Sequence, residues 1–267
     1  IPPHAVPIWE FEIHLWDQFS GRHVVLGEEL SALSAAKQDY ALKENADIIF
    51  SVILDQDRRY FYFFFGNYSG PPEHQGVAMA RMPFEVRANP VGFVSKYYAG
   101  AWTEPGIGGL VSPIFPVSVS WEHSNTDALW GPAIHWNTHL NQYVVVLNRA
   151  CCKSGWPQEG VYLSINPKLD DPGLWTPPTM ILDAANLGSS SAFYPQVLGI
   201  EPGGTDTLAG KFARLFVKGL SQWEIEFLGA NEPGGQPGPP EAPPDRPITE
   251  LISIPKIPVI GLRLQNQ

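Results

Sequence analysis

The feature that most constrains this fold is a pattern that occurs twice along the chain, over residues 60–82 and 143–166. Each copy has an apolar strand that begins with a tyrosine, then an asparagine, a polar loop, and a Gly-Val pair that opens a second short strand. The spacing from the first tyrosine to this glycine differs by one residue between the copies. Repeated strand pairs around a polar loop are typical of radial β-sheet arrays. The pattern therefore predicts that the loops between these strands carry the function.

Proline and glycine are abundant (27 and 25 of 267 residues), which favours short strands joined by tight turns over long helices. We expect an all-β protein with one short helix over residues 28–45 and a first strand over 8–15. Later strands would form a first sheet, a second sheet and the start of a third. In chain order these strands are 48–54, 60–65, 77–82 and 92–98, then 117–121, 133–136, 143–147 and 161–165, then 193–198, 213–217 and 223–227.

The chain divides by composition into three parts. Residues 1–230 can bury a large core and are expected to form one domain. Residues 231–247 are rich in proline and glycine without a hydrophobic period, as in a linker or surface strap. The segment 248–267 is apolar again, and Pro255 and Pro258 exclude a helix there. We expect this segment to pack on the first domain as a strand that completes a sheet begun by the N-terminus.

The charge and hydropathy of the chain exclude two classes of partner. A net charge of −10 without a basic patch argues against nucleic acid. No apolar run approaches the length of a membrane span, so no membrane partner is expected. Localisation depends on weaker features, and we expect a secreted or periplasmic protein. Nine tryptophans could either fill the core between sheets or stack against sugar-like ligands.

The two cysteines, Cys151 and Cys152, are adjacent and cannot form a disulfide framework. Without histidines at metal-ligand spacing they do not predict a zinc site, and no metal ligands are assigned. Three alternatives stay open. The residues are unbonded, they form a ring disulfide with each other, or one of them is a catalytic thiol.

The region 127–175 carries four motifs that occur together in a known family. They are Trp130-Gly131-Pro132-Ala133-Ile134-His135-Trp136-Asn137, Tyr143-Val144-Val145-Val146-Leu147-Asn148-Arg149, Gln158-Glu159-Gly160-Val161-Tyr162, and Asp171-Pro172 with Trp175. This arrangement resembles the five-bladed β-propeller glycoside hydrolases of the arabinanase and xylosidase type. The resemblance implies a five-bladed β-propeller over residues 1–230 and a carbohydrate substrate. It implies no required cofactor, although a structural or catalytic-site calcium ion is compatible with it.

Enzymes of this family carry three acidic residues in a central funnel, because hydrolysis needs one carboxyl group as acid and another as base or nucleophile. Asp47 lies directly before the strand 48–54 and is the candidate for the general base. Asp127 is the candidate for a catalytic or orienting acid. The family would place an acid directly before Gly-Pro, where this chain has Trp130.

Glu159 is the candidate for the general acid. It lies between Trp156 and Tyr162 in the sequence, and aromatic neighbours of this kind would keep a carboxyl group protonated. A turn residue that faces only solvent is the alternative, since the corresponding residue of the first copy is Gln75.

Six further residues are predicted to hold the sugar, by stacking of aromatic rings or by hydrogen bonds. They are Trp130, His135, Trp136, Asn148, Arg149 and Tyr194. Structural alternatives apply to the aromatic residues, to His135 and to Arg149, namely core packing, a buried core histidine and a plain salt bridge.

Together these features predict a glycoside hydrolase that acts on an oligo- or polysaccharide by carboxylate acid/base catalysis in a central cleft. The first alternative is a non-catalytic carbohydrate-binding propeller. The second is a polysaccharide lyase with a histidine or tyrosine base beside Arg149.

Overall fold

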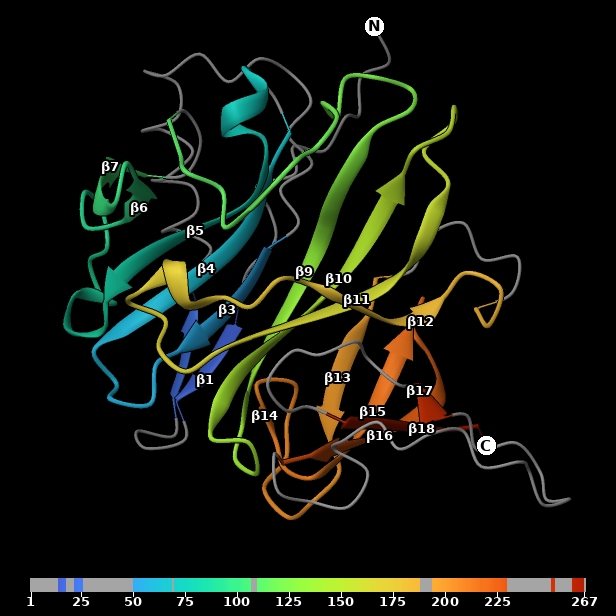
Figure 1. The fold of residues 1–267 in the computed structure, drawn as a ribbon. Helices are drawn as coiled ribbons and strands as arrows, with labels where there is room; N and C mark the ends of the chain where they lie inside the picture. Colours follow the sequence, from blue (N-terminus) through green and yellow to red (C-terminus); the bar gives the residue numbers. More distant parts are fainter. Residues whose placement is uncertain are drawn as a thin grey trace, which may run out of the picture.

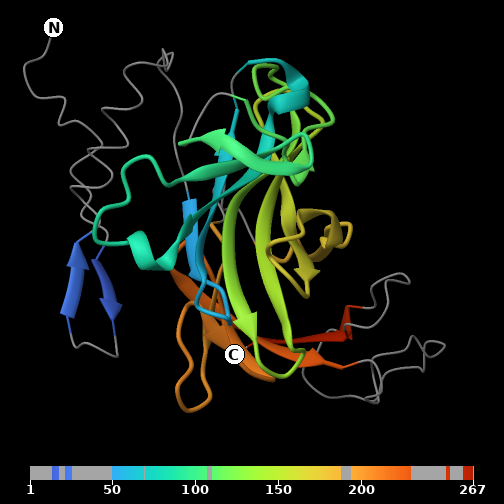
Figure 2. The same cartoon turned by 90° about the vertical axis from the view of Figure 1, so that its left-hand side faces the viewer.

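In the computed structural model, the protein is described at residues 14–17, 22–25, 50–68, 70–106, 110–187, 194–229, 251–252 and 261–266. These residues are mostly β, as predicted, and contain no α-helix. They form three large sheets and one separate hairpin, with the second sheet between the first and the third (Figure 1). The hairpin, β1 (His14–Asp17) and β2 (Arg22–Val25), stands apart from the three sheets (Figure 2).

The first sheet has the strand order β3-β4-β5-β6-β7, and β8 also pairs with β5. Its strands are β3 (Phe50–Leu54), β4 (Tyr60–Asn67), β5 (Gly76–Pro83), β6 (Ser95–Tyr98), β7 (Ala101–Pro105) and β8 (Phe115–Pro116). Short 3₁₀ turns precede and follow β5, namely η2 (Pro72–His74) and η3 (Phe84–Val86).

The second sheet has the order β12-β11-β10-β9-β14, in which only β14 runs parallel to its neighbour. Its strands are β9 (Asp127–Asn137), β10 (Gln142–Cys151), β11 (Gln158–Asn166), β12 (Thr179–Asp183) and β14 (Leu208–Ala209). The turn η4 (Pro172–Leu174) lies between β11 and β12.

The third sheet has the order β13-β15-β16-β18-β17. Its strands are β13 (Gln196–Gly199), β15 (Phe212–Val217), β16 (Leu220–Leu228), β17 (Leu251–Ile252) and β18 (Gly261–Asn266). A C-terminal strand was expected to complete a sheet begun by the N-terminus. Instead β18 pairs with β16 and β17, since β16 offers a free edge within its own sheet.

The repeated pattern is confirmed as two antiparallel hairpins, β4–β5 and β10–β11. Gly76 and Gly160 occupy the same place in them, each facing the backbone of a third strand that pairs with the hairpin. A Cβ atom on Gly76 would overlap the carbonyl oxygen of Phe115, and one on Gly160 would overlap that of Leu182. Close backbone approach therefore explains why both copies need glycine at this position.

Apolar side chains fill the spaces between neighbouring sheets. Tyr62, Phe64 and Val145 belong to the cluster between the first and second sheets. Val161 and Leu215 belong to the cluster between the second and third sheets. A third cluster covers the other face of the first sheet. The second sheet is therefore buried on both faces, which explains the nearly continuous apolar runs of β10 and β11.

Three sequence-based expectations are corrected, and two fall outside the described residues. Residues 117–121 are not a regular strand, because only Val119 forms a bridge, with Asp127. The strand predicted at 133–136 begins six residues earlier, at Asp127, because Gly131 and Pro132 bend β9 without ending it. The described residues form three sheets and do not close a five-bladed ring. The predicted helix 28–45 and the strap 231–247 lie outside the described residues.

Candidate functional site

The end of the second sheet where β9 starts and β10 ends gathers most of the predicted site residues. Antiparallel pairing places Asp127 opposite Cys151, and Arg149 opposite both Leu129 and Gly160. The connection between β10 and β11 lies at the same end. Strand register thus brings residues from three segments to one place, which we call the binding end.

Arg149 is the centre of a polar cluster at the binding end. Its Nε and Nη2 atoms donate to the two oxygens of Asp127, at 2.8 and 3.0 Å. Its Nη1 atom donates to Glu159 Oε2 at 2.9 Å and to the Tyr162 hydroxyl at 3.1 Å. The Tyr162 hydroxyl itself donates to Glu159 Oε2 at 2.6 Å. We call these four residues the Arg149 cluster.

The electrostatics of the Arg149 cluster are those of an ion-paired network. Hydrogen bonding to Asp127 raises the pKa of Arg149 above its usual value, so the guanidinium is always charged. Burial, followed by the hydrogen bond to Glu159, raises the pKa of Tyr162 to about 12. With one guanidinium and two carboxylates in contact, the cluster carries one net negative charge. Every nitrogen of the guanidinium already donates to this network.

Five aromatic side chains surround the binding end. Tyr68 stacks on Trp121 with ring centroids 4.4 Å apart, and Trp121 lies nearly parallel to Trp156 at 6.5 Å and 9°. Trp130 contacts Tyr194 edge to face at 4.9 Å. Trp156 and Tyr194 are 46% and 48% exposed. These five residues form the aromatic cluster.

Cys151 and Cys152 form a disulfide with each other at the end of β10, which decides between the alternatives left open by the sequence. With Asp127 they form the one group of potential metal ligands that lie close together among the described residues. Both sulfurs are bonded to each other, and both Asp127 oxygens bind Arg149. The group therefore does not fit a resident metal ion, and in particular not calcium, which prefers oxygen ligands.

Two predicted polar residues are buried away from the Arg149 cluster. His135 is 1% exposed, and its ring lies edge to face with Phe227 at 5.7 Å. Burial lowers the pKa of His135 to about 3, so the neutral ring belongs to the core. Asn148 is also fully buried, and it faces the side of β10 opposite to Arg149.

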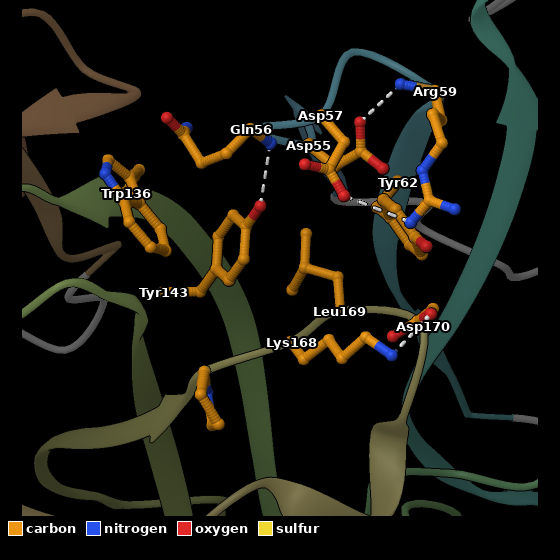
Figure 3. A pocket seen from close by; sticks show the side chains of 11 residues that line it. Asp55, Gln56, Asp57, Arg59, Tyr62, Trp136, Tyr143, Lys168, Leu169 and Asp170 are labelled. Carbon is orange, nitrogen blue, oxygen red and sulfur yellow. Dashed lines mark hydrogen bonds and ion pairs between the residues drawn. The ribbon is translucent and has the colours of Figure 1, made fainter.

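Trp136 lies at the other end of the second sheet, beside a separate pocket of about 140 Å³ (Figure 3). Tyr143 packs against Trp136 in this pocket, at 4.7 Å, and its hydroxyl accepts a hydrogen bond from the Gln56 backbone at 2.9 Å. Asp55 accepts the backbone N–H of Arg59 at 2.6 Å, which holds the β3–β4 turn. Burial raises the pKa of Tyr143 to about 12, so this hydroxyl stays protonated.

The structure thus divides the predicted site. Asp127, Glu159, Arg149, Trp130 and Tyr194 lie at the binding end, whereas Trp136 lies at the opposite end. Asp47 lies outside the described residues. A β-bulge in the pairing of β9 with β10, between the pairs Ala133–Val146 and Trp130–Asn148, separates the two tryptophans. Bulges change which face a side chain takes, so Trp130 and Trp136 point away from each other despite their even spacing.

Sequence reasoning missed Tyr68 and Trp121 as members of the site, and it named Trp156 only as a neighbour of Glu159. Tyr68 follows β4 directly, in the first copy of the repeat, and Trp121 precedes β9. Both hairpins place their loops at the same end, so the repeat itself was the signal for Tyr68. Trp121 gave no such signal, because its position depends on contacts between distant segments.

Comparison with protein-family models, with curated proteins and with solved structures yields no match to this chain. Within the described part of the chain, no helix has the length and apolar character needed to cross a membrane. The geometry of the binding end is therefore the basis for any functional conclusion.

Proposed function

We propose that this protein binds a neutral carbohydrate at the binding end, as a non-catalytic binding protein. The observation that carries the proposal is the exposed ring of Trp156, nearly parallel to Trp121, on the connection whose ends bear Arg149 and Glu159. Exposed aromatic rings beside fixed hydrogen-bonding groups are the usual features of sugar-binding surfaces, since rings stack on the apolar faces of sugars.

The charge of the Arg149 cluster supports a neutral ligand. Asp127 and Glu159 accept hydrogen bonds from all three guanidinium nitrogens of Arg149. No pair of adjacent N–H groups is therefore left to bind a ligand carboxylate with two hydrogen bonds. An acidic sugar would meet a cluster with one net negative charge on a chain with a net charge of −10. Neutral hydroxyl groups can still use the remaining acceptor positions of the two carboxylates.

Direct measurement of binding tests this proposal. We would titrate the protein with neutral cello-, xylo-, galacto- and arabino-oligosaccharides by calorimetry, and compare Trp156→Ala with Phe93→Ala, which removes an exposed ring far along the chain. We expect one sugar class to bind, with about tenfold weaker binding in Trp156→Ala and no change in Phe93→Ala. Equal binding by both variants, or no binding by the native protein, would contradict the proposal.

A glycoside hydrolase is the second candidate, because Asp127 and Glu159 come from different strands to one place. Against it, Glu159 Oε2 accepts hydrogen bonds from both Arg149 and Tyr162 in this arrangement, and a general acid must instead donate a proton. Hydrolysis of aryl glycosides by the native protein, lost in Glu159→Gln, would establish the enzyme. The lyase alternative has less support, because it needs an acidic substrate and an available base.

The five-bladed propeller is likewise a proposal for the complete architecture. It is supported by contacts of β9 with β3 and with β13, the first strands of the two neighbouring sheets, as expected for inner strands of consecutive blades. Export to an oxidising compartment is supported by the disulfide between Cys151 and Cys152. The proposed binding needs no cofactor.

A further inference from the structure

The pocket beside Trp136 is a separate place where this molecule can hold a ligand. It lies at the opposite end of the second sheet from the binding end, and its volume is about 140 Å³. Ligand pockets usually measure about 300–1,000 Å³, so this one suits a small molecule rather than a sugar chain. We call it the Tyr143 pocket.

The Tyr143 pocket has an exposed rim and a buried floor. The side chains of Asp57, Arg59 and Lys168 line it and are each more than half exposed. Asp55 and Tyr143, which also line it, are only 8% and 4% exposed. A small molecule can therefore enter from solvent and reach buried groups.

Two carboxylate oxygens in the Tyr143 pocket accept no hydrogen bond from the described residues. Asp55 Oδ1 accepts from the backbone N–H groups of Arg59 and Tyr60, at 2.6 and 3.2 Å, which leaves Oδ2. Asp170 Oδ2 is paired with Lys168 Nζ at 3.1 Å, whereas its Oδ1 atom is buried without a partner. Withdrawing a carboxylate from water is unfavourable unless donors replace the water. The two oxygens therefore indicate a ligand that donates hydrogen bonds.

Asp55 and Asp170 line the pocket from different segments (Figure 3). Asp55 belongs to the β3–β4 turn, and Asp170 to the segment that follows β11. The Asn166 side chain makes two hydrogen bonds to the backbone around Asp170, at 2.6 and 3.0 Å, so this segment is fixed. Burial raises the pKa of Tyr62 to about 12, hydrogen bonding with Arg81 opposes this, and the charges of both carboxylates add to it. Both carboxylates therefore lie near one hydroxyl group of the pocket.

The charges that line the pocket favour a cation. Three carboxylates and two cations line it, which leaves one net negative charge. Arg59 pairs with Asp57 at 3.2 Å, and Lys168 pairs with Asp170. Asp55 forms no ion pair within the described part of the chain, so its charge is available to a ligand.

A third cation, Arg81, is near the pocket without lining it. Its guanidinium lies over the rings of Tyr60 and Trp102, at 4.4 and 4.8 Å from their centroids. These contacts hold Arg81 on the first sheet, beside Tyr62. They leave the unpartnered oxygens of Asp55 and Asp170 to a ligand.

Aromatic rings decide which kind of cation fits. Tyr62, Tyr143 and Trp136 line the pocket, and the last two lie edge to face at 4.7 Å. A metal ion needs several oxygen ligands around one point, and the three carboxylates do not lie close enough together for that. An organic cation needs few acceptors and is attracted by aromatic rings. The lining therefore fits an organic cation better than a metal ion.

We propose that the Tyr143 pocket binds a small organic ammonium ion, whose N–H groups donate to Asp55 and Asp170 and whose carbon atoms contact the aromatic rings. Because both oxygens need a donor, a quaternary ammonium ion, which has no N–H group, should bind less well. This site is separate from the binding end and does not depend on the proposed function.

Ligand-observed NMR titration of the native protein at pH 7 tests the chemistry of the ligand. The probes are butylammonium chloride, tetramethylammonium chloride, which has the charge without N–H groups, and butanol, which has no charge. We expect butylammonium to bind in the millimolar range, tetramethylammonium about tenfold more weakly, and butanol not at all. No binding of butylammonium, or equal binding of either other probe, would overturn the proposal.

Titration of Asp55→Asn and Asp170→Asn with butylammonium places the site. Each substitution keeps the shape of the side chain and removes its charge. The matched control is Asp183→Asn at the end of β12, where Oδ1 accepts a backbone N–H group at 2.9 Å, as in Asp55. We expect about tenfold weaker binding in each pocket variant and no change in Asp183→Asn. Native affinity in both pocket variants would overturn the assignment.

Two further measurements keep the result unambiguous. Trp156→Ala should bind butylammonium like the native protein, so a failure of sugar binding and a failure of ammonium binding are distinguishable. If the melting temperature of Asp55→Asn falls because the β3–β4 turn is altered, Asp170→Asn decides the matter, since Asp170 Oδ1 has no partner to lose.

Discussion

The two hairpins of the repeated pattern share a backbone but differ at the residue that precedes the shared glycine. In the first hairpin this residue is Gln75, which is fully buried. Its Oε1 atom accepts from the Ser120 hydroxyl at 3.0 Å and from the Trp121 backbone at 2.8 Å. Its Nε2 atom donates to the Gly70 carbonyl at 2.7 Å. Gln75 thus fastens the segment before β9 to the first sheet.

In the second hairpin the same position holds Glu159, whose side chain is 35% exposed and paired with Arg149. One scaffold position therefore has a structural role in one copy and faces a solvent-accessible cluster in the other. The difference arises from the segment around Trp121, whose Ser120 hydroxyl and Trp121 N–H group bind the Gln75 side chain. A repeated pattern therefore predicts backbone geometry more safely than it predicts the role of a side chain.

The largest expected effect comes from exchanging the residue types at these two positions. Gln75→Glu would place a carboxylate oxygen against the Gly70 carbonyl, in a fully buried position. We expect a loss of about 3–5 kcal/mol in the free energy of unfolding at pH 7, typical of an uncompensated buried charge. Urea unfolding would measure this loss, and a loss no larger than that of an ordinary surface substitution would show that Gln75 has no structural role.

The strands beside the two hairpins differ in a buried residue. The first hairpin pairs with β3, which buries Ile53, whereas the second pairs with β9, which buries His135. The pKa of His135 is about 3 in the folded protein, below its usual value of 6.5, so the unfolded chain binds the proton more readily. Stability should therefore fall as the pH falls from 6.5 towards 3, by at most about 1.4 kcal/mol per pH unit from this group.

His135→Leu should remove this contribution. The free energy of unfolding of the native protein and of the variant, measured between pH 7 and pH 4.5, should diverge below pH 6.5 by up to about 2–3 kcal/mol. At pH 7 the variant should be at least as stable as the native protein, because neither ring nitrogen of His135 has a partner among the described residues. Parallel pH profiles would show that His135 is not the group responsible.

The smallest expected effect is that of Glu159→Gln, the reciprocal of the first substitution. Arg149 keeps both contacts to Asp127, and the amide oxygen can still accept from Arg149 or Tyr162. We expect a change in the free energy of unfolding below about 1 kcal/mol, as for partly exposed ion pairs. A loss as large as that of Gln75→Glu would mean that the two positions are equally structural.

Much of the fold could be predicted from local pattern. The apolar runs of β4, β10 and β11 and the Gly-Val starts of the second strands identify both hairpins, because alternation and turn residues act locally. The full length of β9 could not be predicted, since Gly131 and Pro132 are typical turn residues that here form a bulge within a strand. The pairing of β18 with β16 depends on segments far apart in sequence.

The candidate site was predictable to the same extent. Asp127, Arg149 and Glu159 were each predicted as candidates, and short-range pairing within β9–β10–β11 explains why they meet. The role expected of Glu159 as a proton donor depends on its neighbours in space, which include Arg149 as well as aromatic rings. The sequence placed Trp136 in the same site as Trp130, which is wrong. One extra residue of β9 in its pairing with β10 reverses the face taken by every residue beyond it.

The adjacency of Asn148 and Arg149 on β10 has a consequence for how this end of the sheet can change during evolution. Neighbouring residues of a strand face opposite sides, so an uncharged amide and a cation are separated by a single step of the chain. Inserting or deleting one residue in β10 would present the cation where the amide belongs, and the reverse. Homologues that recognise other ligands should therefore differ here by replacement of residues, with the length of this strand preserved.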